Sequence, residues 1–157
     1  MKRKNTAELY YGYNLRLLLI VGGVLIAATL LPIVIFWSDV ASNGDGLFAL
    51  AICIAAIVLS VFLPAVYYLV QYLYYRKAEL TDVQEVFLAR TDTNRMRNIG
   101  FVVEVNVGGV VRTAVTKRVF TATLIGAPLL DEYSGRAVEV GYNPDRDEVV
   151  VLAKAEG

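Results

Sequence analysis

Residues 47–75 read LFALAICIAAIVLSVFLPAVYYLVQYLYY and contain no charged side chain. As a helix that rises about 1.5 Å per residue, this run would be about 43 Å long. The hydrocarbon core of a bilayer is only about 30 Å thick. The sequence therefore predicts a transmembrane helix over residues 47–75 that either tilts or extends its last turns beyond the lipid.

A second uncharged run, residues 17–37, is also long enough to cross a bilayer as a helix. It is longer than the apolar region of a typical cleaved signal peptide, which is the alternative interpretation. The connecting residues 38–46 include Ser-Asn-Gly-Asp-Gly, which is typical of a turn. We therefore expect a short N-terminal segment, residues 1–16, and then a transmembrane hairpin whose helices are joined by an extracytoplasmic loop over residues 38–46.

The basic residues give the expected orientation of this hairpin. They flank the two runs, at Lys2, Arg3, Lys4, Arg16, Arg76 and Lys77. The connection carries Asp39 and Asp45 and no lysine or arginine. Because basic residues stay on the cytoplasmic side, we expect a multi-pass protein of the cell inner (plasma) membrane with both termini in the cytoplasm.

Aromatic and small residues suggest how the helices are held in lipid. Tyrosine and basic side chains favour the headgroup level, which predicts membrane-interface anchoring by the residues at the end of the second run; a cluster that binds a ligand or partner is the alternative. These residues are Tyr67, Tyr68, Tyr72, Tyr74, Tyr75, Arg76 and Lys77. Small residues four positions apart let helices approach closely, which predicts helix packing through Gly23 with Ala27 and Ala51 with Ala55.

After Lys77 the pattern changes to short runs rich in β-branched residues, typical of strands. We expect a cytoplasmic β domain over residues 78–157 with strands near 83–91, 99–107, 110–120, 136–142 and 148–153. The alternation in the second strand predicts one inward face, which consists of Phe101, Val103, Val105 and Val107. Gly108-Gly109 suits a two-residue hairpin turn. The expected fold class is membrane α + β: a two-helix transmembrane hairpin followed by a small five-stranded OB-like or SH3-like β barrel, with a strongly curled sheet as the alternative.

One apolar stretch, residues 124–130, does not alternate as a strand would. We expect it to form a short helix that plugs the barrel, or a loop that touches the membrane or the hairpin.

Two stretches of this domain resemble a bacterial family of unknown function. They are residues 101–109, FVVEVNVGG, and residues 138–145, VEVGYNPD, which carries a Tyr-x-Pro motif. Members of that family have two membrane helices and a small β domain. The resemblance covers roughly residues 80–153, lacks the usual aromatic residue at Asn106, and implies the architecture without an activity. Membrane-anchored OB domains attached to membrane proteases also look similar.

Composition argues against several function classes. Histidine, the commonest general base and metal ligand, is absent, and Cys53 is the only cysteine. No nucleophile motif or phosphate-binding glycine loop is present, so we expect no enzyme activity, no metal and no cofactor. The net charge of zero argues against nucleic acid as a partner. Four basic residues suggest contact with lipid headgroups, with a solvated face as the alternative: Arg95, Arg97, Lys117 and Arg118.

The strong anchor and the lack of catalytic residues favour a non-enzymatic interaction module. It would present the β barrel at the cytoplasmic membrane face to a protein partner or to a second copy of itself. A homo-oligomeric pore, or an accessory subunit of a channel or transporter, is the first alternative. An immunity protein against a membrane-active toxin is a weaker one.

Overall fold

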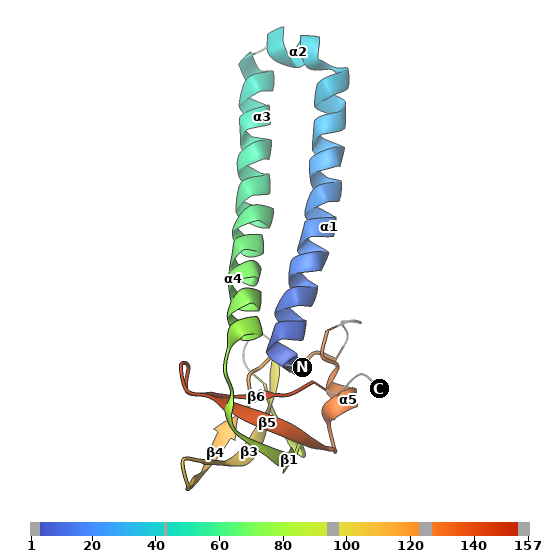
Figure 1. Ribbon diagram of the computed structural model, residues 1–157. Coiled ribbons are helices and arrows are strands. Elements are labelled where there is room, and N and C mark those ends of the chain that lie inside the picture. Colours follow the sequence, from blue (N-terminus) through green and yellow to red (C-terminus); the bar gives the residue numbers. More distant parts are fainter. Residues whose placement is uncertain (1–3, 43, 94–97, 123–126, 154–157) are drawn as a thin grey trace. The chain divides into compact units, whose positions relative to one another are not determined.

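The computed structural model describes residues 4–42, 44–93, 98–122 and 127–153 and contains two compact units. One unit is residues 14–70. The other combines residues 1–13 with residues 71–157. It therefore contains the start of the first long helix, the end of the second and the β domain (Figure 1).

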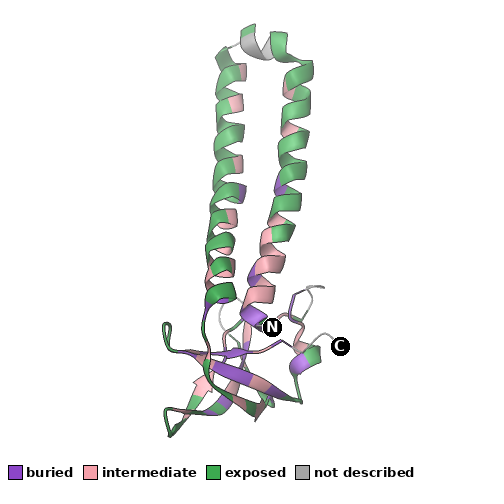
Figure 2. Ribbon diagram, in the orientation of Figure 1, coloured by how far each residue is buried: buried purple, intermediate pink, exposed green. Residues whose placement is uncertain are grey.

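Long apolar helices make up the first unit. Helix α1 spans Thr6–Ile35, and a continuous helical stretch from Gly44 to Lys77 comprises α3 (Gly44–Ile57), η1 (Val58–Phe62) and α4 (Leu63–Lys77). Both stretches are long and apolar enough to cross a membrane. Their apolar side chains are largely exposed (Figure 2), as expected of helices in contact with lipid rather than in a soluble core.

The helices differ from the predicted hairpin in two local features. Residues 38–46 are not simply a loop, because helix α2 covers Trp37–Ser42 and α3 begins at Gly44 with Asp45 in its first turn. A carboxylate is favourable there, near the positive end of the helix dipole. The π-helical turn η1 ends at Phe62, two residues before Pro64. Because proline has no N–H to continue the α-helical bonding, such a turn is a common local adjustment.

A close contact between the two helices lies at Gly22, one position from the predicted Gly23. Gly22 is buried, and a methyl group there would overlap the Val61 side chain. At Gly23 an added methyl group would meet nothing within 4 Å. Ala27, Ala51 and Ala55 are exposed. One residue rotates the position by about 100° around a helix, so the predicted residues lie off this contact. Helix packing through these residues stays a prediction.

We expect Gly22→Val to destabilise the helix hairpin by about 1–3 kcal/mol, because the larger side chain must displace Val61. Equilibrium unfolding in mild micelles, followed by the fluorescence of the single tryptophan, would measure this. Gly23→Val is the matched control, since it has the same helix propensity cost and open space around it. Equal effects of the two variants would contradict the prediction.

The described residues of the β domain form two three-stranded antiparallel sheets. One has the order β1-β5-β6, formed by β1 (Thr81–Phe87), β5 (Ala137–Asn143) and β6 (Glu148–Val151). The other has the order β2-β3-β4, formed by β2 (Arg90–Thr93), β3 (Ile99–Val107) and β4 (Val110–Val115). The short helix α5 (Leu130–Tyr133) precedes β5.

Patterns in the sequence predicted the positions of most of these strands. Phe101, Val103 and Val105 of β3 are buried, as their alternation predicted, whereas Val107 at the end of the strand is partly exposed. The Gly108-Gly109 turn is confirmed, because both residues have positive φ angles and Val107 pairs with Val110 across the hairpin. The core extends from Phe101 to Phe120, whose rings are 4.9 Å apart, and includes the buried valines of β5 and β6.

Two strand predictions were wrong in detail. The single strand expected over residues 83–91 is two strands, β1 and β2, because the chain turns inward at the fully buried Leu88 and each half joins a different sheet. The strand expected over residues 110–120 ends at Val115. In the apolar stretch 124–130, residues 124–126 lie outside the described residues, and a helix begins only at Leu130.

Candidate functional site at the helix ends

The start of α1 is built into the β domain through two buried polar residues. The Asn5 side-chain amide donates to the Tyr75 carbonyl oxygen at 3.0 Å, and its oxygen accepts from the Glu8 N–H at 2.8 Å. Asn5 therefore caps α1 and contacts the end of α4 at the same time. The Thr6 hydroxyl donates to the Val151 carbonyl oxygen at 3.1 Å.

Residues before α1 also extend the β6 ladder. Asn5 forms an antiparallel bridge with Leu152, and the Ala153 N–H donates to the Lys4 carbonyl oxygen at 2.9 Å. The first described residues of the chain are thus hydrogen-bonded to the last. They belong to the domain rather than to a free N-terminal segment.

Tyr75 is the central side chain on the α4 side. Its ring is fully buried and stacks on Tyr11 of α1, with ring centres 5.4 Å apart and planes nearly parallel. Its hydroxyl donates to a Glu148 carboxylate oxygen at 2.5 Å. A buried tyrosine hydroxyl needs such a partner, since leaving it unpaired would cost free energy.

Charged side chains surround this tyrosine. The Lys117 ammonium pairs with the other Glu148 oxygen at 2.9 Å, and both side chains are mostly buried. Arg146 donates to the Gln71 amide oxygen at 2.8 Å and to the Tyr75 hydroxyl at 3.3 Å. Its guanidinium lies 3.8 Å from the centre of the Tyr74 ring, a cation–π contact. We call Tyr74, Tyr75, Lys117, Arg146 and Glu148 the junction cluster.

The Tyr-x-Pro turn contacts the junction cluster through Asn143. Asn143 is fully buried, its amide donates to the Tyr74 hydroxyl at 3.1 Å, and its oxygen accepts from the Asp145 N–H at 3.2 Å. The second bond is an Asx-type turn contact, which suits the Asn-Pro-Asp sequence. The motif noticed in the sequence therefore orders the turn and ties it to α4.

Next to the turn, Asp147 accepts hydrogen bonds from two partly exposed neighbours. The Tyr142 hydroxyl and the Arg112 guanidinium each donate to the same Asp147 carboxylate oxygen at 2.8 Å, and they lower the pKa of this carboxyl below its usual value. A depressed folded-state pKa contributes stability that is present above the unfolded pKa. It is lost as the pH falls through the folded value. Because the pair is exposed, its contribution is small.

The structure divides the predicted interface residues into two groups. Tyr75 has no exposed surface with which to contact headgroups, and Tyr74 is engaged by Arg146 and Asn143. These two tyrosines fasten the helix to the domain. Membrane-interface anchoring stays a prediction for Tyr67, Tyr68, Tyr72, Arg76 and Lys77.

The four basic residues proposed to contact lipid do not form one described patch. Arg95 and Arg97 lie outside the described residues. Lys117 is paired with Glu148 inside the junction cluster, and Arg118 donates to Asp92. Neither Lys117 nor Arg118 is therefore a freely available cation. A part of their charge is neutralised within the domain.

Sequence reasoning missed Asn5, Arg146 and Glu148. The Asn5-Thr6-Ala7-Glu8 pattern resembles a helix N-cap, which could have moved the predicted start of the first helix from residue 17 to residue 6. No protein-family model, curated protein or solved structure matches this chain. The family resemblance therefore stays a prediction, and the junction cluster is interpreted from its own geometry.

Proposed function

We propose that this chain is a non-enzymatic, membrane-anchored interaction module. Its two helices span the inner (plasma) membrane with both termini in the cytoplasm, and its β domain is presented at the cytoplasmic face to a protein partner or to a second copy of the chain. The proposal rests on one observation: the start of α1 and the end of α4 are hydrogen-bonded within the same compact unit as the β domain.

A hydrogen-bonded connection between the helix ends and the β domain suits a module that presents a surface to a partner better than a flexible linker would. Only Ala78, Glu79 and Leu80 connect α4 to β1, and Ala78 is buried. The groups of the junction cluster bond to one another, to the turn and to Gln71. A cluster with this bonding keeps the bonded segments in one arrangement. Pre-organised surfaces lose less conformational entropy when they bind a partner.

We further propose that the two sheets form an OB-like, partly open barrel. Two contacts between the sheets support it. A parallel bridge joins Thr116 to Val149, and the Gln84 side-chain amide both donates to and accepts from the Asn106 backbone at 2.9 Å. A five-stranded, partly open Greek-key barrel is the OB arrangement.

The domain has exposed apolar residues suited to a protein partner. Val110 and Val111 follow the Gly108-Gly109 turn, and each is 67% exposed. Val83 and Phe87 of β1 are also more than half exposed. Because contiguous exposed apolar patches are common where proteins associate, we choose positions among these residues to test the proposal.

Site-specific photocrosslinking in intact membranes at native expression would test the proposal. A crosslinking amino acid at Val111 or Phe87 should give a stoichiometric adduct, either with one partner or with a second copy. The same group at Asp131, an exposed residue of α5, is the control and should give none. The absence of adducts from Val111 and Phe87, or equal labelling from all three sites, would overturn the proposal.

The observation favouring the pore alternative is that two small residues of the uncharged run 17–37, Gly23 and Ala27, are exposed. Such residues allow close association of helices from several copies. Flux through proteoliposomes that contain only this chain would favour the pore. Absence of flux together with an adduct at Val111 would favour the interaction module.

A further inference from the structure

Strand β4 lies at the outer side of its sheet, and part of its backbone is unpaired there. The sheet order β2-β3-β4 places it at one edge. Val107 and Val110 flank a two-residue turn and form a hydrogen-bonded pair, and the bonding alternates from there along the antiparallel ladder. The N–H and C=O groups of Val111 and Thr113 consequently point away from β3. Within the described residues, these groups have no hydrogen-bond partner.

The Gln84 side chain supports this assignment from the opposite edge of β3. Asn106 pairs with Val111 across the ladder, and its N–H and C=O groups both bond to the Gln84 side-chain amide at 2.9 Å. Neither group of Asn106 is therefore directed at β4, as the alternation requires. Gln84 closes the edge of β3 at Asn106, whereas the edge of β4 at Val111 is open.

The open edge of β4 lacks the features that usually prevent pairing with another chain. Exposed edge strands are commonly protected by lysine, proline or a bulge. Residues 110–115 read VVRTAV, contain no lysine or proline, and pair with β3 in one continuous register. The guanidinium of Arg112 is held by Asp147 at 2.8 Å, so this edge carries no uncompensated charge. Because Val110 and Val111 are also largely exposed, the edge suits the addition of another strand.

We propose that β4 pairs with β4 of a second copy, antiparallel and centred on Val111. The same surface of both copies then meets in a closed dimer. Each Val111 N–H donates to the Val111 carbonyl oxygen of the other copy, and Arg112 lies opposite Val110 of the second copy. The inference deepens the proposed interaction module by naming its partner, and it rests on both copies lying at the same membrane face. That confinement raises their effective concentration, so a short interface suffices.

Two other centres of pairing are less favourable. Centring on Arg112 would place the two Arg112 side chains directly opposite each other, and like charges in such positions are destabilising. Centring on Thr113 would place the second copy beside Thr116, where Val149 of β6 already forms a bridge. Centring on Val111 avoids both conflicts and covers the two exposed valines.

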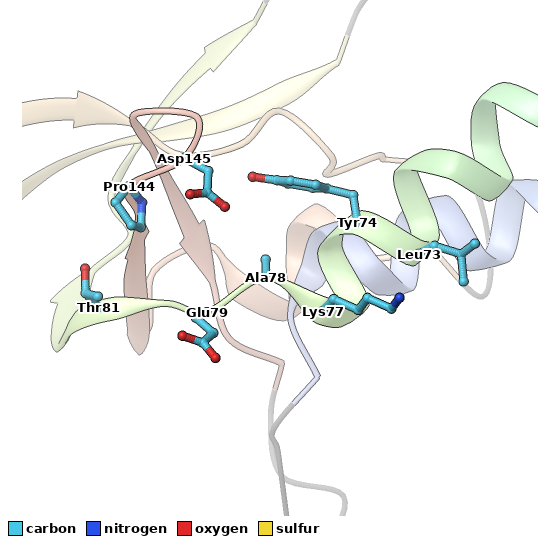
Figure 3. A pocket seen from close by; sticks show the side chains of 8 residues that line it. All are labelled: Leu73, Tyr74, Lys77, Ala78, Glu79, Thr81, Pro144 and Asp145. Carbon is cyan, nitrogen blue, oxygen red and sulfur yellow. The ribbon is translucent and has the colours of Figure 1, made fainter.

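The pocket at the end of α4 offers no comparable set of aligned groups. It has a volume of about 540 Å³ and lies beside the turn between β5 and β6 (Figure 3). Lys77, Glu79 and Asp145 are among the residues that line it, yet their side chains point in different directions. The groups at the edge of β4, in contrast, all point toward one partner strand.

Disulfide crosslinking in isolated membranes at native expression would test the pairing. Val111→Cys and its matched control Thr113→Cys would each be made in a Cys53→Ser chain, so that the new cysteine is the only one. Directly paired residues of this type have Cα atoms about 5.5 Å apart, within reach of a disulfide. The two Thr113 residues would be about 14 Å apart. Since both side chains are exposed, we expect roughly tenfold more disulfide-linked dimer from Val111→Cys.

A second variant tests the backbone bonds of the pairing. Val111→Pro deletes an N–H that points away from β3, so it removes no bond of the β3–β4 ladder, and proline is tolerated at such edge positions. Native mass spectrometry of the full chain released from mild micelles should show roughly tenfold less dimer. Val111→Thr keeps the N–H and nearly the same shape, and should keep the dimer. Amide exchange of β3 verifies that each variant is folded.

Equal disulfide yields at the two positions, or a higher yield from Thr113→Cys, would overturn the inference. An unchanged amount of dimer in Val111→Pro would do so as well. Labelling of Thr113→Cys by a membrane-impermeant maleimide in sealed inverted vesicles tests the membrane placement separately. Labelling together with no disulfide in Val111→Cys contradicts only this inference, whereas labelling only after permeabilisation contradicts the proposed placement.

Discussion

Replacing Tyr75 with alanine is expected to lower the free energy of unfolding of the β domain by about 3–5 kcal/mol. The ring is fully buried and stacks on Tyr11, so its removal leaves a cavity at the junction. The hydroxyl is also lost, which leaves Glu148 and Arg146 with one hydrogen-bond partner fewer. Glu148 keeps Lys117 and Arg146 keeps Gln71, so the cavity is the main cause of the expected destabilisation.

Amide hydrogen exchange in mild micelles would measure the effect strand by strand. Because each 1.4 kcal/mol corresponds to a factor of about ten, the slowest amides of β5 and β6 should exchange at least about 100-fold faster in Tyr75→Ala. Tyr67→Ala is the control, since Tyr67 is more than half exposed and belongs to the other compact unit. Unchanged exchange in Tyr75→Ala would show that the junction does not stabilise the domain.

Elements set by local pattern could be predicted from the sequence. The two apolar runs predicted both long helices, and the alternation Phe101, Val103, Val105 predicted β3 with its buried face. Gly108-Gly109 predicted the hairpin, because only residues tolerant of positive φ suit that turn. In each case the signal and the structure it specifies lie within a few residues of one another.

The junction cluster could not be predicted, because its contacts join distant parts of the chain. Asn5 bonds to Tyr75, 70 positions away, and Thr6 bonds to Val151, 145 positions away. In a sequence, Asn5 looks like a residue of a polar tail and Tyr75 like an interface aromatic. Burial depends on which surfaces meet in three dimensions, and no local periodicity carries that information.

Breaking the Lys117–Glu148 pair is the second large effect that we expect. Glu148→Leu should destabilise the domain by about 3 kcal/mol, since it leaves the mostly buried Lys117 ammonium without its counter-charge. Lys117→Met should also destabilise it, because Glu148 keeps only its uncharged partners. The double variant Lys117→Met/Glu148→Leu removes both charges and should cost less than the sum of the single variants.

A double-mutant cycle measured by the same amide exchange would give the coupling energy of this pair. We expect at least about 1.5 kcal/mol, in the range found for contacting residues in one network. The exposed pair Asp92–Arg118 is the matched control and should give less than about 1 kcal/mol, since solvent screens it. If the two coupling energies were equal, Lys117 and Glu148 would be behaving as a surface pair. The junction would then depend on the Tyr75 ring and the Asn5 cap rather than on its charges.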